Sequence, residues 1–449
     1  MKLDFIDIRR AYYHAEARRK IYINLPEGDQ EEGKCGILFK SLEGTRDAAQ
    51  NWEYTYSKFM MSIGFERGKA TPCIFTQASK EVRVVVHGDD FPVLGYVKDL
   101  DWFRQQIGDK FSVKFRGRIG PCQTDLKAIR ILNRILEWTK EGIIYEADQR
   151  HAEIIKNQMG MKDESKGVNT PGVKGISDDA AQDSDRHRAT KFRAVAARAN
   201  YLCQDRSEIQ FAVKELCRAM SKPKEDDWNK LKRLARYLVG KERCTIDFKY
   251  QSKLDGVTVW TDSEFASTNP VRKSINEEIK DEHFEMINGI NLDGPASCHR
   301  SPSGGPIMLG SHLIQSLSSI QKVTAWSSGE AEYYAIVKGA SQGIGIRSML
   351  QDFQINDSSQ RHVEIKEDSS AAKGIASRRG LGKLKHNDIK ELWIQEKVSL
   401  EELKITKVPG TVNLADAFTK YCDSHVLNYH LEHTHQHIKN DRHELMPTV

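Results

Sequence analysis

The order of apolar and polar residues along the first hundred positions predicts short β-strands around one helix. Val82, Val84 and Val86 alternate with other side chains before the sequence HGDD, a pattern typical of a strand that ends in a tight turn. LDFIDI and KIYINL have the same strand-like character. Between the strands, AAQNWEYTYSKFMMSIGF carries large apolar residues at helical spacing, which predicts core packing of Trp52, Tyr56, Phe59 and Met60.

The pattern changes after residue 120. We expect residues 121–250 to be mainly helical, because stretches such as RAVAARANYLCQDRSEIQFAVKELCRAMSK repeat apolar residues with the period of a helix. Residues 162–188 interrupt this region. They are rich in Gly, Asp and Ser, which predicts a mobile linker.

Alternating strands and helices return at GVTVWTDSEFA and define a predicted α/β section over residues 251–421. Inside it, the charged residues 275–301 are typical of a surface insertion. Residues 422–449 contain many histidines, and we expect a solvated, poorly ordered tail there, with metal capture as the alternative. The predicted fold class is therefore multidomain, with an α+β part followed by an α/β part.

Composition adds only a little to this picture. A chain of 449 residues is long enough for two or three domains with their own cores. Charged residues make up 29% of the chain but the net charge is only +5, which permits nucleic-acid binding without requiring it. The eight cysteines form no C-x-x-C pair, and no apolar run is long enough to cross a membrane. We therefore expect an intracellular protein with reduced thiols and no membrane partner.

Two adjacent carboxylates, Asp89 and Asp90, lie at the predicted hairpin tip. Alone, they are typical of a polar turn, since Gly and Asp are favoured turn residues. Asp7 also ends an apolar strand, so an antiparallel sheet can bring three carboxylates together. Such a group can hold two divalent ions about 3.5–4 Å apart, which is one arrangement for phosphoryl chemistry.

Several segments resemble one family in the same order. DIRRAYY and HGDDF resemble the first catalytic motif and the Asp-Asp motif of reverse transcriptases, and SLEGTRDAAQNW, KIYINLPEG and MSIGFERGKATPCIF resemble copia-type elements. The resemblance covers nearly the whole chain and implies a reverse transcriptase palm over residues 1–120 and a thumb or connection over 121–250. It implies that Asp7, Asp89 and Asp90 bind Mg²⁺ or Mn²⁺. It also implies that Tyr12 lies under the nucleotide sugar with Arg10 nearby, although ordinary core packing explains Tyr12 equally well.

A second acidic set lies in residues 251–421. Asp262 ends the strand GVTVWTD. Ser327 and Glu330 are spaced as a helix capping box, which predicts a structural role for Glu330. Glu332 lies roughly 200° further around that helix, on the small and apolar face that would meet a sheet. Glu332 is therefore the predicted inward carboxylate.

Two further acids complete the set. Asp368 follows the strand VEIKE, where a helix N-cap is the alternative role, and Asp416 follows ITKVPGTVNL on a short helix. This order of acids resembles the ribonuclease H fold of copia-type elements. The resemblance implies that Asp262, Glu332, Asp368 and Asp416 bind two Mg²⁺ or Mn²⁺ ions and cleave RNA in RNA–DNA hybrids. It further suggests a substrate contact for His386, for which a surface or packing histidine is as good an interpretation.

The chain also departs from the resemblance. It begins almost at Asp7, whereas reverse transcriptases carry a fingers region before that motif, so we expect incomplete polymerase activity unless another polypeptide supplies the missing part. Pro92 is awkward inside a paired strand because it has no N–H. Residues 275–301 fall where the family continues directly.

The leading hypothesis is a Pol fragment of a copia-type retrotransposon that joins an incomplete RNA-directed DNA polymerase to a ribonuclease H. Its expected partners are an RNA template, a DNA primer, deoxynucleotide triphosphates and RNA–DNA hybrids, in a cytoplasmic virus-like particle or the nucleus. The alternatives are a decayed, non-catalytic nucleic-acid-binding protein and a relic without a selected role.

Overall fold

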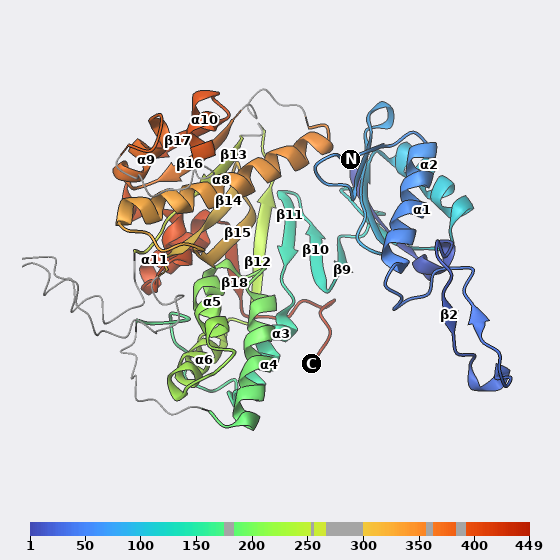
Figure 1. Ribbon diagram of the computed structural model, residues 1–449, viewed down its shortest axis with the longest axis horizontal. Helices are drawn as coiled ribbons and strands as arrows, with labels where there is room; N and C mark the ends of the chain where they lie inside the picture. Colours follow the sequence, from blue (N-terminus) through green and yellow to red (C-terminus); the bar gives the residue numbers. More distant parts are fainter. Residues whose placement is uncertain (175–183, 253–255, 266–299, 356–361, 383–391) are drawn as a thin grey trace, which may run out of the picture. The chain divides into compact units, whose positions relative to one another are not determined.

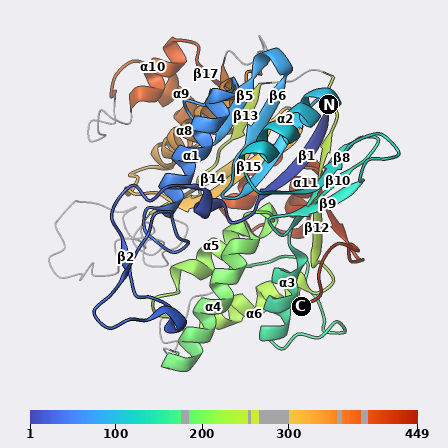
Figure 2. The same cartoon turned by 90° about the vertical axis from the view of Figure 1, so that its right-hand side faces the viewer.

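The computed structural model describes residues 1–174, 184–252, 256–265, 300–355, 362–382 and 392–449. Contacts divide the chain into two units, each with its own core. One unit comprises Met1–Ile129, Glu137–Lys140 and Gly345–Asn356, and the other comprises Arg130–Leu136, Glu141–Ile344 and Asp357–Val449. Both mix helices with sheets (Figures 1 and 2), so the mixed α and β character expected from the sequence is confirmed at this level.

The first unit is built on a six-stranded antiparallel sheet in the order β4-β5-β6-β7-β1-β8. The strands are β1 (Lys2–Ile8), β4 (Glu66–Arg67), β5 (Ile74–Gln77), β6 (Val82–Val85), β7 (Asp90–Gly95) and β8 (Val113–Ile119). Helices α1 (Ala48–Ser62) and α2 (Val97–Lys110) supply side chains to the core. Trp52 and Met60 on α1 are buried as the helical spacing predicted. A small ribbon of β2 (Tyr22–Ile23) and β3 (Gly36–Ile37) lies outside this sheet.

Pro92 is accommodated inside β7 because of the way its two neighbours pair. On one side Pro92 lies opposite Phe5 of β1. On the other side the ladder to β6 contains only two pairs, Arg83 with Leu94 and Val84 with Val93, and ends before Pro92. A residue without an N–H is tolerated where the ladder has ended.

The second unit contains a bundle of four helices, gathered together in both views of the molecule (Figures 1 and 2). They are α3 (Gln149–Gln158), α4 (Arg186–Leu202), α5 (Gln210–Arg218) and α6 (Glu225–Leu238). Their apolar faces form one core that includes Phe192, Val195 and Leu234. The helical expectation for residues 121–250 therefore describes this part of the region. Of the predicted linker 162–188, residues 175–183 lie outside the described residues.

The prediction that residues 121–250 are mainly helical is wrong before α3 and after α6, where the chain forms strands. β9 (Ala128–Ile131), β10 (Arg134–Trp138), β11 (Gly142–Glu146) and β12 (Arg243–Lys249) form a sheet with β18 (Gln436–Lys439). The sequence explains the first hairpin, since Ile129, Ile131 and Ile135 recur at strand spacing and are buried. Between them Leu132 and Asn133 adopt φ values of 47° and 63°, the left-handed pair that a two-residue hairpin turn requires.

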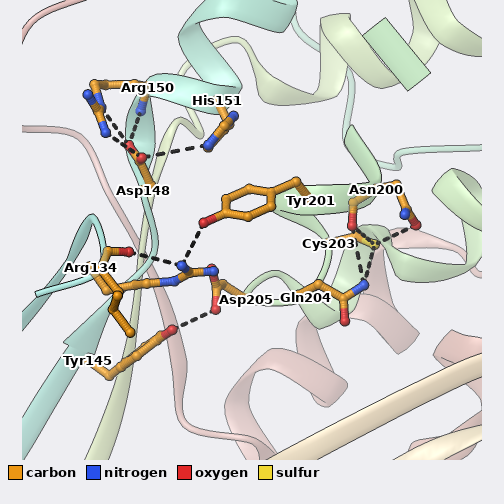
Figure 3. Close-up of polar contacts among 11 residues, drawn as sticks. Arg134, Tyr145, Asp148, Arg150, His151, Asn200, Tyr201, Cys203, Gln204 and Asp205 are labelled. Carbon is orange, nitrogen blue, oxygen red and sulfur yellow. Dashed lines mark hydrogen bonds and ion pairs between the residues drawn. The ribbon is translucent and has the colours of Figure 1, made fainter. Parts of the chain in front are cut away.

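A polar cluster attaches this hairpin to the end of α4 (Figure 3). Asp205 accepts hydrogen bonds from Arg134 Nε on β10 (3.0 Å) and from the hydroxyl of Tyr145 on β11 (2.6 Å). Arg134 Nη1 also donates to the Tyr201 hydroxyl at 2.7 Å. One carboxylate therefore joins two strands to the helical bundle.

The prediction of a solvated, poorly ordered C-terminal tail is also wrong. Residues 422–449 contain α11 (Ser424–His433), which is capped by Asp423, and β18, which pairs with β12. His430 is buried, and its Nε2 lies 2.7 Å from Ser207 Oγ. The high histidine content misled the prediction, because the order of this segment depends on strand pairing with residues almost 200 positions earlier.

A third sheet, in the order β15-β14-β13-β16-β17, forms the rest of the second unit. Its strands are β13 (Val257–Trp260), β14 (Pro302–Leu309), β15 (His312–Ile320), β16 (Val363–Glu367) and β17 (Leu403–Lys407). β13, β14 and β15 pair antiparallel, whereas β13, β16 and β17 run parallel. Residues 275–299 of the predicted insertion lie outside the described residues.

Helices complete this part of the unit. α8 (Ser328–Asp352) belongs to this unit as far as Ile344. It packs closely on the sheet, since a Cβ atom at Gly343 would lie 2.7 Å from both Val259 and Val363. α9 (Ser370–Ser377) and α10 (Trp393–Ser399) follow β16. None of the helices in the described parts of the chain has both the length and the apolar character needed to cross a membrane.

Candidate functional site

Three predicted carboxylates meet at one edge of the third sheet. Asp262 follows β13 and Asp368 follows β16, and these strands run parallel, so their carboxyl ends lie at the same edge. Glu332 reaches the same place from the first turns of α8. One side-chain oxygen from each of the three lies within 4.8 Å of the others. In the described part of the chain, no other set of three His, Cys, Asp or Glu side chains is gathered this closely.

The donor set suits a hard divalent cation. All three side chains offer oxygen, the donor that Mg²⁺ and Mn²⁺ prefer. Glu332 Oε2 is buried and has no hydrogen-bond partner among the described residues, a costly state that a bound cation would relieve. Burial, followed by the neighbouring carboxylates of Glu367, Asp262 and Asp368, raises the pKa of Glu332 to about 11. The carboxylates therefore fit a metal ion.

Glu330 and Glu332 have different environments, as the helical spacing predicted. Glu330 Oε2 accepts a hydrogen bond from Trp326 N at 2.9 Å, and Glu330 N donates to Ser327 Oγ at 3.2 Å. These bonds cap the start of α8. On the other face of α8, Gly339 packs against Thr261, so that face meets β13 and directs Glu332 to the sheet edge.

Asp262 is fixed by neighbours on both sides. Its backbone forms a bridge with Gly304, and its carboxylate accepts a hydrogen bond from the Thr419 hydroxyl. Burial raises the pKa of Asp262, and the ammonium of Lys420 partly offsets that rise. The side chain is thus held at the sheet edge by residues more than 150 positions away.

Asp416 lies beside the group of three but does not join it. It belongs to a short 3-10 helix, η9 (Leu414–Phe418), and its Oδ1 lies 2.7 Å from Lys420 Nζ. Burial and the nearby Asp262 raise the pKa of Asp416 to about 6, against the effect of Lys420. Of the four acids singled out in the sequence, three therefore converge, and the fourth, Asp416, forms an ion pair with Lys420.

Glu367 is a buried acid that sequence reasoning missed. Its Oε2 accepts from Thr261 Oγ1 at 2.7 Å, and its Oε1 accepts from the backbone N–H groups of Asp368 and Ser369 at 3.0 and 3.1 Å. Burial raises its pKa well above the usual range. The signal was present, because Glu367 shares the inward face of β16 with Val363 and Ile365. Glu367 holds the backbone that presents Asp368.

The alternative role considered for Asp368 is wrong. The side chain that caps α9 belongs to Ser369, whose Oγ accepts from Ala372 N at 3.2 Å. Asp368 thus does not serve as the helix cap. His386, the other residue expected near this site, lies outside the described residues.

The first acidic group is arranged differently. Asp7 on β1 pairs in register with Asp90 on β7, and Ile8 N donates to Asp89 O at 2.8 Å. Arg116 on β8 lies against both acids, with its Nη1 3.1 Å from Asp90 Oδ1 and 4.0 Å from Asp7 Oδ2. Burial raises the pKa of Asp90, and Arg116 opposes the rise.

These residues do not fit a metal ion in the present arrangement. Asp89 is exposed, and the oxygens of Asp7, Asp89 and Asp90 do not gather as those of the other group do. A guanidinium, rather than a cation site, faces Asp7 and Asp90. Arg116 was not singled out from the sequence, because only the pairing of β8 with β1 brings it there.

Tyr12 and Arg10 lie just after β1. Tyr12 is on the 3-10 helix η1 (Ala11–His14) and packs, partly buried, against the core of the first unit. Arg10 is exposed and adopts a left-handed conformation with φ 54°. The turn that carries Asp89 is held by Trp52, whose Nε1 donates to Gly88 O at 2.8 Å. This contact gives Trp52 a role beyond core packing.

Comparison with known families identifies the first segment. Residues 2–123 match the family model described as reverse transcriptase (RNA-dependent DNA polymerase). This segment is therefore similar to reverse transcriptases. This finding confirms the resemblance that DIRRAYY and HGDDF suggested.

Relatives cover most of the chain. It is 22% identical over 435 residues to the retrovirus-related Pol polyprotein from transposon TNT 1-94 of Nicotiana tabacum, which includes 94% of this chain and 30% of that protein. It is 23% identical over 423 residues to the corresponding polyprotein from transposon RE1 of Arabidopsis thaliana, with 92% and 26% covered. The chain is homologous to Pol polyproteins of copia-type plant transposons, and it spans less than a third of their length.

Among solved structures, the N-terminal RNase H domain of a Mycobacterium tuberculosis protein, fused to maltose-binding protein, is 12% identical. The match covers 40% of this chain and 97% of that one, with a TM-score of 0.22. Likeness at this level does not define a fold.

Proposed function

We propose that residues 251–421 form a metal-dependent ribonuclease H that cleaves the RNA strand of RNA–DNA hybrids. The observation that carries the proposal is the convergence of Asp262, Glu332 and Asp368 to within 4.8 Å. The sheet beneath them supports it, since three antiparallel strands continue into two parallel ones and present the acids at one edge.

The roles follow from the chemistry of the donors. Asp262, Glu332 and Asp368 would hold Mg²⁺ or Mn²⁺, and Asp416 is the fourth acid beside them. A divalent ion bound there would lower the pKa of a water ligand and polarise a phosphodiester oxygen. The predicted two-ion form needs a second position next to Asp416. His386 remains proposed as a substrate contact.

The test is cleavage of a labelled RNA–DNA hybrid in Mg²⁺. We expect the full chain to shorten the RNA strand and Asp262→Asn to lose this activity, because the substitution removes one ligand charge. Asp441→Asn is the matched control, since Asp441 is an exposed acid that pairs with Arg243. Binding of the hybrid without cleavage by all three proteins would instead favour the non-catalytic nucleic-acid-binding protein.

RNA-directed DNA synthesis is a second candidate function, favoured by the match of residues 2–123 to the reverse transcriptase family. We propose it only together with another polypeptide, because in this chain alone Arg116 faces Asp7 and Asp90. In this proposal residues 1–120 are the palm, with Asp7, Asp89 and Asp90 as catalytic carboxylates and Tyr12 and Arg10 near the nucleotide. Residues 121–250 act as thumb or connection, 251–421 as the nuclease, and 422–449 as an ordered C-terminal addition. An RNA template, a DNA primer and deoxynucleotide triphosphates would be the partners, in the cytoplasm or nucleus.

A further inference from the structure

Lys420 lies at the acidic edge of the third sheet, and neither the motif order nor the comparisons assign it a role. Its Nζ lies 2.7 Å from Asp416 Oδ1 and 3.8 Å from Asp262 Oδ2. We propose that Lys420 takes the place of a second divalent ion, so that the site binds one ion and uses a built-in ammonium beside it. This inference rests on the proposed ribonuclease H function.

The separation of the four acids supports this assignment. Asp262, Glu332 and Asp368 gather around one position, whereas Asp416 stays outside the group. A second ion about 3.5–4 Å from the first would need oxygens from the side where Asp416 lies. Lys420 already contacts Asp416 and approaches Asp262 there. The ammonium and a second ion would compete for the same two carboxylates.

The segment that carries Lys420 is fixed to the sheet. Asn413 begins η9 by accepting a hydrogen bond from Ala415 N at 3.1 Å, and its Nδ2 donates to Thr261 O at 3.0 Å. Phe418 is fully buried, and Ser318 Oγ donates to its carbonyl oxygen at 2.6 Å. Lys420 follows directly. Its position therefore comes from the packing of η9 rather than from a free surface side chain.

The adjoining residue strengthens this picture. The Thr419 hydroxyl donates to Asp262 Oδ2, the same oxygen that faces Lys420. That oxygen is thus satisfied by the segment itself. Asp262 can offer its remaining donor capacity to the ion that it shares with Glu332 and Asp368. Fixed positive charge in a buried acidic site acts without the need to capture an ion from solution.

The experiment counts Mn²⁺ ions bound to the full chain by electron paramagnetic resonance, with and without Asp262→Asn. The difference between the two counts measures the ions that depend on this site and removes ions bound elsewhere. We expect this difference to be one ion for the otherwise wild-type chain and two ions for the chain that carries Lys420→Met. Methionine is similar in length to lysine but has no ammonium group, so Asp416 and Asp262 become available to a second ion. Asp368→Asn provides a second way to empty the site if Asp262→Asn does not fold.

Lys397→Met is the matched control, since Lys397 forms a similar ion pair with Glu402 at 2.8 Å on α10. It should leave the count at one. A count of two in the wild-type background, or of one in both backgrounds, overturns the role of Lys420. A count of zero in both backgrounds overturns the metal site itself, and with it the proposed function. The wild-type count decides between one and two ions even if Lys420→Met does not fold.

Discussion

At the scale of single residues, both acidic groups of this protein have a basic side chain beside them that comes from elsewhere in the sequence. Arg116 faces Asp7 and Asp90 from a different strand, and Lys420 reaches Asp262 from 158 positions away. In both places a basic side chain lies where acids would otherwise repel one another. The chemistry of each acidic group therefore depends on a cation that the motif alone does not reveal.

His430 gives a residue-scale prediction about pH. Complete burial lowers its pKa from the ordinary 6.5 to about 4. Between pH 4 and 6.5 His430 is therefore protonated in the unfolded chain but neutral in the folded chain. The contribution of neutral His430 to the free energy of unfolding is complete above about pH 6.5 and is lost as the pH falls toward 4. The linked free energy is at most about 3 kcal/mol. Urea unfolding between pH 4 and 7 should show a shallower pH dependence in His430→Gln than in the wild type.

His425→Gln is the control for that experiment, because His425 is exposed on the same helix. It should keep the wild-type pH dependence. Equal slopes for His430→Gln and the wild type would show that protonation of His430 does not contribute to acid unfolding.

At the scale of elements, glycine permits the close approach of α8 to the sheet. A Cβ atom added at Gly339 would lie 2.5 Å from Thr261 Cγ2 and 3.1 Å from Val259 Cγ1. The helix also carries Glu332, so its distance from β13 sets where that carboxylate lies. A change in the packing of α8 against β13 is therefore expected to move Glu332 as well.

We predict that Gly339→Ala destabilises the protein by about 1–3 kcal/mol, because the added methyl group must displace α8 or β13. It should also weaken Mn²⁺ binding, since Glu332 moves with the helix. Gly345→Ala is the matched control, as a Cβ atom there meets nothing within 4 Å. That substitution should be neutral or stabilising by up to about 1 kcal/mol, as expected for alanine in a helix. Similar unfolding midpoints for the two variants would contradict the tight packing at Gly339.

At the scale of the whole molecule, each of the two units carries one acidic group, and the two groups differ. The group in the first unit has one exposed acid and an arginine facing the other two. The group in the second unit has three convergent carboxylates. The match to the reverse transcriptase family covers residues 2–123, yet the better-formed candidate metal site lies outside that segment. We therefore expect one preparation of the protein to cleave an RNA–DNA hybrid but not to extend a primer.

Primer extension tests this difference. We predict that the chain, given Mg²⁺ or Mn²⁺ and deoxynucleotide triphosphates, extends a labelled DNA primer on an RNA template no more than Asp90→Asn does. The reason is that Arg116 occupies the side of Asp90 where a cation would bind. Hybrid cleavage in the same preparation would show that the protein is folded. Extension that Asp90→Asn abolishes and Asp109→Asn, at an exposed acid, retains would contradict the prediction.

The sequence by itself determined the local elements and the kinds of residue at their ends. Strand and helix periods identified β1, the hairpin that carries Asp89 and Asp90, α1, and the separate faces of Glu330 and Glu332. These features depend on neighbours within about one turn or one hairpin, so they can be recognised in short stretches of sequence. The order of short motifs such as DIRRAYY and HGDDF likewise gave the resemblance to reverse transcriptases, which the match of residues 2–123 confirms.

Only the tertiary structure decided which of these residues meet. Strand pairing placed Arg116 against Asp90, brought β18 to β12 and buried His430, and the docking of η9 placed Lys420 beside Asp262. The wrong helical prediction around residues 128–146 has another cause, because the strand spacing of Ile129, Ile131 and Ile135 was already present in the sequence. The contacts of Arg116, β18, His430 and Lys420 are of a different kind. Such contacts join positions more than a hundred residues apart or across different strands, where local periodicity carries no information about distance. Charge neutralisation in both acidic groups is therefore a property of the fold.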